Sequence, residues 1–144
     1  AGGMERARVF AKELKDSGLV MTDKRRPAPN MAEITKVIGD VVGKDVILID
    51  DMIDTGGTAA KSAEAIVKSG ANSVSMFCTH GVLSGDAVRN IENSHIEELI
   101  ITDTINNQEK LKGSKKIKVL TVADLIAEAI KRIVSNKSIS QLFS

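Results

Sequence analysis

The stretch Val46-Ile-Leu-Ile-Asp-Asp-Met-Ile-Asp-Thr-Gly-Gly-Thr58 decides the fold of this chain. Its first four residues, Val46 to Ile49, are apolar and predict the central strand of a buried parallel sheet. Two adjacent acids follow, then a loop of small and hydroxylated residues, and then an alanine-rich helix. This order is typical of an open α/β sheet, in which ligands bind at the carboxyl ends of the strands.

The loop Asp54–Thr58 predicts a binding site for a phosphorylated sugar. Gly56 and Gly57 allow the backbone to approach an anion, and the amides that open the next helix carry partial positive charge. Asp50 and Asp51 could accept hydrogen bonds from sugar hydroxyls or hold Mg²⁺. The alternative is an ordinary strand-to-helix turn with a Gly-Gly hinge. The stretch is neither a Walker A loop nor the Gly-x-Gly-x-x-Gly dinucleotide fingerprint, because it lacks the residues that define them.

The bulk composition is that of one globular domain. The chain has 144 residues, of which 42% are hydrophobic, which is enough for a sizeable core. The formal net charge of +1, with 27% charged residues, gives no reason to expect nucleic acid or a membrane as a partner. The single cysteine, Cys78, cannot form an internal disulfide, which suits the cytoplasm, and its apolar neighbours favour core packing over catalysis.

Helical and strand patterns alternate along the chain, which predicts a doubly wound, mainly parallel α/β sheet. Residues 135–144 form a serine-rich tail. Helices are expected at Met4–Leu14, Thr58–Ser69, Ser84–Ile91 with Ser84 as N-cap, and from Thr121 as cap to Val134. Strands are expected at Leu19–Met21, Ile34–Ile38, Val46–Ile49, Val74–Thr79, Glu97–Thr102 and Ile117–Leu120, and loops at Asp23–Asn30 and Asp103–Ser114.

The loop segment Lys24-Arg-Arg-Pro-Ala-Pro29 is the second informative feature. It follows a predicted strand, so it could close over an anionic ligand at the edge of the sheet. Lysine and arginine can neutralise the charge that builds up during phosphoryl transfer. The alternative is a solvated basic loop.

Together, these segments resemble the ribose-phosphate pyrophosphokinase (PRPP synthetase) family of the bacterial type. The resemblance covers essentially the whole chain in order. It rests on Asp23–Asn30, Val37–Asp40, Asp45–Thr58, Cys78–Gly81 with Ser84 and Gly85, Thr102–Ile105, Leu125–Ile130 and Ser138–Ser144.

The resemblance implies a type I phosphoribosyltransferase-like fold and an enzyme of PRPP and nucleotide biosynthesis. Such a diphosphokinase transfers pyrophosphate from Mg-ATP to the C1 hydroxyl of ribose 5-phosphate, giving PRPP and AMP. It also implies a cytoplasmic homo-oligomer with Mg²⁺ as cofactor, and no nucleic acid or membrane partner.

The resemblance further implies a role for each matching residue. Gly56 stands where the family often has Ala or Cys, and this small change should only loosen the loop. Asp50 is a possible Mg²⁺ ligand, with another expected upstream of Ala1. The implied roles are ribose 5-phosphate binding for Asp50, Asp51, Asp54, Thr55, Gly56, Gly57 and Thr58, catalysis for Lys24 and Arg26, and regulation for Ser138, Ser140 and Phe143.

The resemblance covers only the carboxyl-terminal half of the family protein. We therefore expect residues 1–144 to be one phosphoribosyltransferase-like domain of a longer two-domain chain, inactive alone because the amino-terminal half carries most ATP contacts. Two alternatives stay open: a type I phosphoribosyltransferase that uses PRPP, and a non-catalytic regulatory subunit associated with the synthetase. His80 could serve in acid-base chemistry, but a hydrogen-bonded loop anchor is the preferred interpretation.

Overall fold

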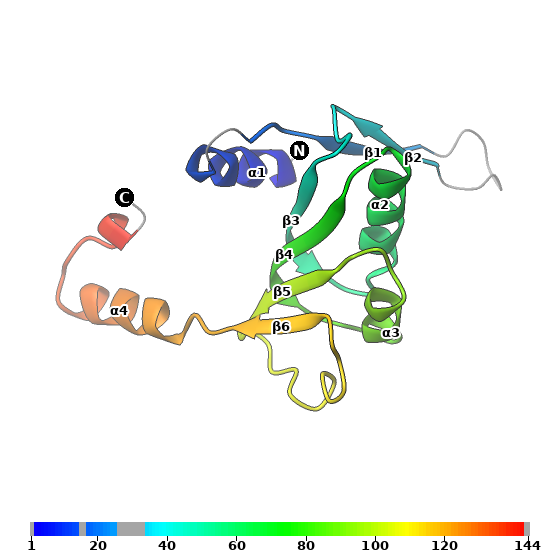
Figure 1. The fold of residues 1–144 in the computed structure, drawn as a ribbon. Coiled ribbons are helices and arrows are strands. Elements are labelled where there is room, and N and C mark those ends of the chain that lie inside the picture. The colour runs from blue at the N-terminus through cyan, green and yellow to red at the C-terminus, as the bar shows by residue number, and fades with distance from the viewer. Residues whose placement is uncertain (1, 15–16, 26–33, 143–144) are drawn as a thin grey trace.

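The computed structural model of the chain describes residues 2–14, 17–25 and 34–142. A parallel sheet of four strands has the order β3-β4-β5-β6, and β1 and β2 pair separately as an antiparallel hairpin (Figure 1). The α/β fold with a mainly parallel sheet is confirmed. The elements in chain order are α1 (Gly2–Glu13), β1 (Met21–Arg25), β2 (Ile34–Ile38), β3 (Asp45–Ile53), α2 (Gly57–Lys68), β4 (Ser73–Gly81), α3 (Ala87–Glu92), β5 (Glu98–Thr102), β6 (Ile117–Leu120), α4 (Ala123–Val134) and the short 3₁₀ helix η1 (Ser140–Leu142).

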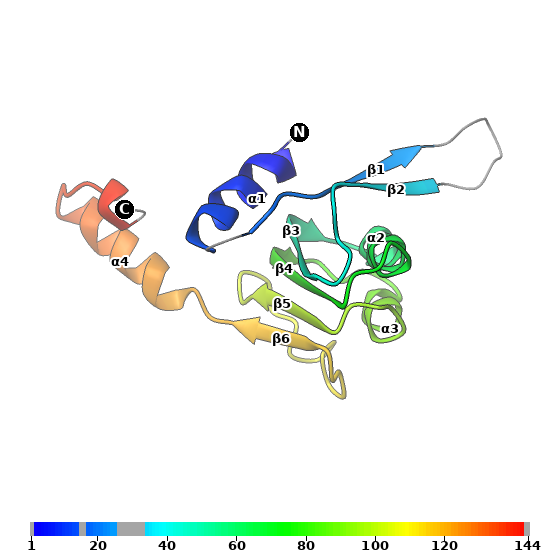
Figure 2. The same ribbon diagram turned by 45° about the horizontal axis from the view of Figure 1, so that its top comes forward.

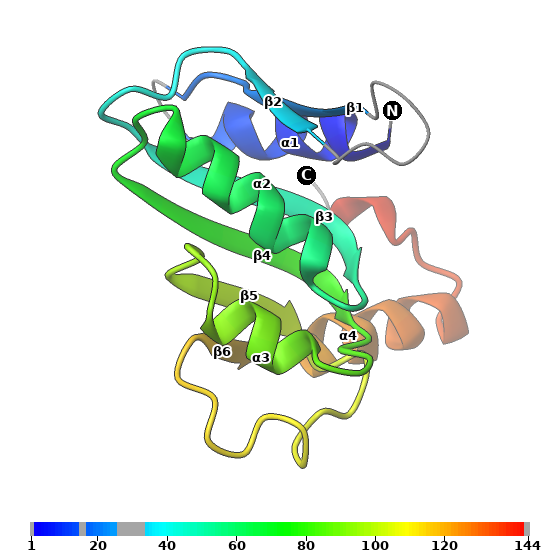
Figure 3. The same cartoon turned by 90° about the vertical axis from the view of Figure 1, so that its right-hand side faces the viewer.

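Helices lie on both sides of the parallel sheet, as a doubly wound fold requires. Helices α2 and α3 cover one face, with α2 beside β3 and β4 (Figure 3). Helix α1 lies on the other side, near β3 (Figure 2). Phe10 of α1 packs against Phe77 of β4 with ring centroids 5.7 Å apart, so an aromatic contact fixes α1 to this face.

The core lies between the sheet and helices α2 and α3. Val74, Met76 and Cys78 are buried at alternate positions of β4, as the period of two in a strand dictates. Helix α2 buries Ala59, Ser62, Ala63 and Ile66, which follow the 3.6-residue helical period. Gly70, at φ 99°, ends this helix in the left-handed conformation that favours glycine, as predicted.

Strand β3 differs from the prediction in length and position. It extends through Asp50 and Asp51 to Ile53, so both acids lie within the strand rather than beyond it. It also forms an edge of the described parallel sheet, not its centre. An apolar run indicates burial but says nothing about the order of the strands, and this explains the difference.

The predicted boundaries of β1, α3 and α4 also differ from the structure. A strand was expected at Leu19–Met21 and a loop from Asp23, but β1 begins at Met21 and runs to Arg25, because the strand follows the pairing with β2. Helix α3 begins at Ala87 with Asp86 as N-cap, since Gly85 has a φ of 54° and interrupts the expected helix. Val122 is the N-cap of α4, although Thr121 Oγ1 accepts a 3.2 Å hydrogen bond from the amide of Ala123.

Helix α4 extends away from the sheet beyond the end of β6 (Figure 1). None of its residues is buried, and its large apolar side chains are exposed at Leu125, Ile126, Ile130, Ile133 and Val134. Within the described ranges, no helix combines the length and apolar character needed to cross a membrane.

Candidate functional site

A cavity of about 650 Å³ lies at the carboxyl end of β3 and the start of α2. Thr22 of β1 also lines it, so the hairpin contributes one side. The cavity brings together five of the predicted ligand-binding residues, namely Asp50, Asp54, Thr55, Gly56 and Thr58. Asp51 and Gly57 were predicted with them but do not line this cavity.

The two glycines of the loop meet different structural demands. Gly56 is the N-cap of α2 with φ 73°, a left-handed conformation that a side chain disfavours. A Cβ at Gly56 would also lie 3.3 Å from the Ile91 side chain. A Cβ at Gly57 would meet only Thr55 Oγ1, at 3.9 Å. The backbone constraint is therefore at Gly56, where glycine fits the observed conformation and does more than loosen the loop.

The start of α2 is suited to binding an anion. The first four amides of a helix have no acceptor within the helix, and they carry the positive end of its dipole. Gly56, Gly57 and Thr58 occupy the N-cap and the first two helical positions. Because the space beside Gly57 is open, a phosphate could approach the backbone there.

Contacts with the following segments hold the carbonyl groups of the loop. Asn90 Nδ2 of α3 donates a 2.9 Å hydrogen bond to the carbonyl oxygen of Thr55. The amide of Ser84 donates a 3.1 Å bond to the carbonyl oxygen of Asp54. Sequence reasoning missed Asn90, because a polar residue on a predicted helix gives no local sign of a partner 35 residues away.

The two acids of β3 differ in environment. Partial burial raises the pKa of Asp50, and a hydrogen bond with the Asp51 carboxyl raises it further. That hydrogen bond lowers the pKa of Asp51, and the charge of Arg6 also contributes. Arg6 Nη2 of α1 lies 2.9 Å from Asp51 Oδ2. Sequence reasoning missed Arg6 too, because the pair is 45 residues apart.

The acid pair offers part of a Mg²⁺ site. No group of three or more His, Cys, Asp or Glu side chains in the described part of the chain could hold a metal ion. Mg²⁺ commonly uses one or two carboxylates and completes its shell with water and substrate phosphates. Asp50 lines the cavity, so its carboxylate fits this kind of donor set.

The predicted basic pair is only partly described. Lys24 lies in β1, where its backbone pairs with Thr35, but its side chain is not among the parts of the chain that the structure describes. Arg26 lies outside the described residues altogether. The catalytic roles of the two residues therefore stay predictions.

The predicted regulatory residues lie in the tail after α4. The amide of Ser140 donates a 3.2 Å hydrogen bond to Ser138 Oγ, and Phe143 lies outside the described residues. Arg132 of α4 holds this segment, because its Nη1 donates a 3.1 Å hydrogen bond to the Ser138 carbonyl oxygen. Sequence reasoning did not identify Arg132, since it lies on a helix outside the tail.

His80 and Cys78 have surroundings that fit structural roles. His80 Nδ1 lies 2.9 Å from Thr104 Oγ1, as a loop anchor would, and His80 does not line the cavity. Burial raises the pKa of the Cys78 thiol to about 11, so the thiol is protonated at neutral pH. Thr104 in turn donates to the carbonyl oxygen of Thr79, which fastens the turn after β5 to the end of β4.

Comparisons with known proteins agree with one another. The family described as phosphoribosyl synthetase-associated domain matches residues 4–144. The ribose-phosphate pyrophosphokinases of Shewanella oneidensis and Hyphomonas neptunium are each 50% identical to the chain over 143 and 142 residues, covering 99% of the chain but only 45% and 46% of those proteins. The chain thus spans less than half the length of these relatives.

A solved structure is also similar. The crystal structure of phosphoribosylpyrophosphate synthetase from Mycobacterium smegmatis matches with a TM-score of 0.84 and 35% sequence identity. The match covers 94% of this chain and 43% of that one.

Proposed function

The chain belongs to the phosphoribosyl synthetase-associated family, and we propose that it supplies the ribose 5-phosphate site of a ribose-phosphate diphosphokinase. In that reaction, a pyrophosphoryl group passes from ATP to the C1 hydroxyl of ribose 5-phosphate, giving PRPP and AMP. The observation that carries the proposal is the cavity that joins Asp50 of β3 to the Asp54–Thr58 loop at the start of α2.

The loop would bind the 5-phosphate. The amides at the start of α2 and the hydroxyl groups of Thr55 and Thr58 are suitable donors for phosphate oxygens. The open space beside Gly57 supports a close approach of the phosphate to the backbone. With the phosphate there, the ribose ring would extend toward Asp50 and Asp51, whose carboxylates can accept hydrogen bonds from its hydroxyl groups.

Lys24 and Arg26 would be the catalytic basic pair, acting on the transferring phosphates. Thr22 lines the cavity, and Lys24 follows it two residues later on the same strand, which supports a place for Lys24 near the bound sugar. Positive charges at such a position stabilise the negative charge that develops during phosphoryl transfer.

Mg²⁺ would be held by Asp50 together with a ligand upstream of Ala1. When bound, the cation neutralises charge on the ATP phosphates and orients them. Asp50 then serves as its carboxylate ligand and Asp51 as a partner of the ribose hydroxyls, while the loop keeps the sugar in place.

The whole protein would be a cytoplasmic homo-oligomer that binds ribose 5-phosphate, ATP and PRPP. The exposed apolar side chains of α4 support a role for this helix in packing against another protein surface. Ser138, Ser140 and Phe143 would contribute to a regulatory site. The hydrogen bonds of Arg132 to the Ser138 carbonyl oxygen and to Gln141 Oε1 give the tail a defined shape, which supports such a site.

An assay for AMP release tests this function. We expect the 144-residue chain to form little or no PRPP from Mg-ATP and ribose 5-phosphate, since most ATP contacts are expected in the other half. We expect the longer protein to release AMP and PRPP in equal amounts. Rapid turnover by the 144-residue chain alone would contradict the proposed division of the site, and a longer protein without turnover would contradict the activity.

A further inference from the structure

The contact between Arg6 and Asp51 ties helix α1 to the acid pair. Arg6 Nη2 and Asp51 Oδ2 are 2.9 Å apart, and the two side chains are 44% and 51% exposed. An exposed ion pair of this kind contributes little to folding stability. The packing of Phe10 against Phe77 already fixes α1 to the same face of the sheet. The ion pair therefore affects the charge and position of the Asp51 carboxylate more than it affects the stability of α1.

The candidate site has an unfavourable charge balance for the ligand it is proposed to bind. Asp50 and Asp54 line the cavity, and Asp51 is adjacent, with its amide donating a 2.9 Å hydrogen bond to Asp50 Oδ1. A sugar phosphate carries negative charge, so three neighbouring carboxylates would repel it. Arg6 is placed to offset the charge of one of them.

Arg6 also affects where the Asp51 carboxylate lies. Asp51 does not line the cavity, whereas Asp50 does, and the guanidinium of Arg6 holds the Asp51 carboxylate beside α1. A guanidinium suits this role because it stays charged at every physiological pH and presents its donors in a fixed plane.

We propose that Arg6 is a positioning residue for ribose 5-phosphate binding, which acts through Asp51. It orients the Asp51 carboxylate, which is proposed to accept a hydrogen bond from a ribose hydroxyl, and it compensates the charge of that carboxylate, so that an anionic sugar phosphate can bind beside the acid pair. The inference rests on the proposed function of the cavity and adds a residue from a helix that contributes nothing to the lining of that cavity.

A double-mutant cycle read by calorimetric titration with ribose 5-phosphate tests the role. Arg6→Gln should weaken binding about tenfold, as expected for uncovering one charge near an exposed site. In the Asp51→Asn background the same change should alter binding less than about twofold, because no carboxylate charge remains to be compensated. Equal losses in both backgrounds would overturn the proposal, since Arg6 would then act independently of Asp51.

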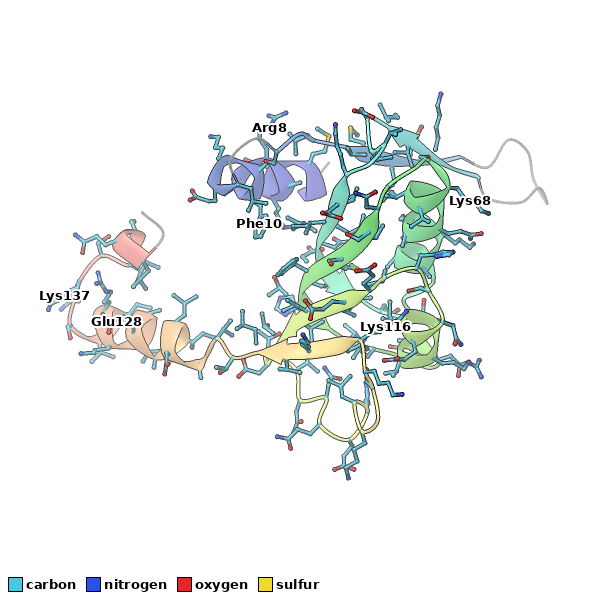
Figure 4. All side chains as sticks on the ribbon, in the orientation of Figure 1. Arg8, Phe10, Lys68, Lys116, Glu128 and Lys137 are labelled. Carbon is cyan, nitrogen blue, oxygen red and sulfur yellow. The ribbon has the colours of Figure 1, made fainter. Side chains whose placement is uncertain are left out.

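Two further variants separate positioning from a general effect on the helix. Arg8→Gln removes the same charge from α1, where Arg8 has no ion-pair partner among the described residues, and it should leave binding unchanged. Figure 4 shows Arg8 and Phe10 on opposite sides of α1, so Arg8 lies away from the contact with the sheet. Arg6→Lys keeps the charge and should retain at least about a third of the wild-type affinity.

The outcomes distinguish this inference from the proposed function. If the folded wild-type chain does not bind ribose 5-phosphate, the proposed function fails, and the role of Arg6 fails with it. If the wild type binds and Arg6→Gln binds equally well, only the positioning role is overturned. Equal losses for Arg6→Lys and Arg6→Gln would also overturn it, because charge would not be the relevant property.

Discussion

The carbonyl oxygen of Thr55 accepts a 2.9 Å hydrogen bond from Nδ2 of Asn90. One residue is in the proposed phosphate loop, and the other is on α3, which packs against α2. This bond occupies the carbonyl oxygen of Thr55, which would repel an anion. The amides of the loop remain available to bind one. Asn90 is thus expected to control the shape of a site that it does not line.

Replacing Asn90 with Ala should weaken both the fold and the site. We expect a loss of about 1 kcal/mol in the free energy of unfolding, together with weaker binding of ribose 5-phosphate. Asn72→Ala is a matched control, because Asn72 Nδ2 donates a 2.7 Å bond to the Gly43 carbonyl oxygen at the amino ends of β3 and β4. It should lower stability similarly but leave binding intact. Equal binding by the two variants in calorimetry would argue against the role of Asn90.

The two loop glycines should respond differently to alanine. Gly56→Ala places a side chain at φ 73° and 3.3 Å from Ile91, so we expect a loss of stability of about 1–2 kcal/mol or more. Gly57→Ala meets only Thr55 Oγ1 at 3.9 Å and should be neutral or stabilising by up to about 1 kcal/mol. Chemical denaturation measures both. A stable Gly56→Ala variant would show that the loop can change its conformation.

The acid pair predicts stability changes of opposite sign. The pKa of Asp50 is raised above 3.8, so this carboxyl binds its proton more tightly in the folded chain, and stability falls as the pH rises through the window above 3.8. Asp50→Asn removes that loss and should raise the melting temperature at a pH of about 7.5, with a smaller gain as the pH approaches about 4.

Asp51→Asn is the matched comparison. The pKa of Asp51 is lowered below 3.8, so its stabilising effect is present above 3.8 and is lost as the pH falls through the lower folded pKa. This variant should therefore melt at a lower temperature than the wild type at a pH of about 7.5. Thermal unfolding at several pH values checks both variants, and changes of the same sign would be inconsistent with the opposite pKa shifts.

Lys24→Ala should affect turnover and not sugar binding. In the longer protein we expect kcat to fall about a hundredfold or more, as for the loss of one donor that stabilises the transition state. The KM for ribose 5-phosphate should change little, because the basic pair is proposed to act on the transferring phosphates. Steady-state kinetics decide the matter: a raised KM with an unchanged kcat would make Lys24 a ground-state binding residue.

Local patterns predicted much of the fold. Strand β2 matches the predicted Ile34–Ile38, and Gly70 ends α2 as expected, because both depend on neighbouring residues. The edge position of β3 depends on the order of strands, which no single segment encodes.

The candidate site was predictable to a similar extent. The stretch Val46–Thr58 identified five residues that line the cavity, because a strand-loop-helix junction is a local feature of the sequence. These residues are Asp50, Asp54, Thr55, Gly56 and Thr58. The contacts that hold this junction, from Arg6 and Asn90, join residues 45 and 35 positions apart and have no local signature. The left-handed backbone of Gly56 was equally hidden, since either glycine of the pair could have adopted it.

The most direct test of the account is a calorimetric titration of the 144-residue chain and its Gly57→Val variant with ribose 5-phosphate. The wild type should bind. The variant should remain folded, as measured by thermal unfolding, because the space at Gly57 is open. It should nevertheless lose binding, because the new side chain occupies the place of the phosphate. Binding by the folded variant equal to that of the wild type, or no binding by the folded wild type, would contradict the assignment of the loop as a phosphate site.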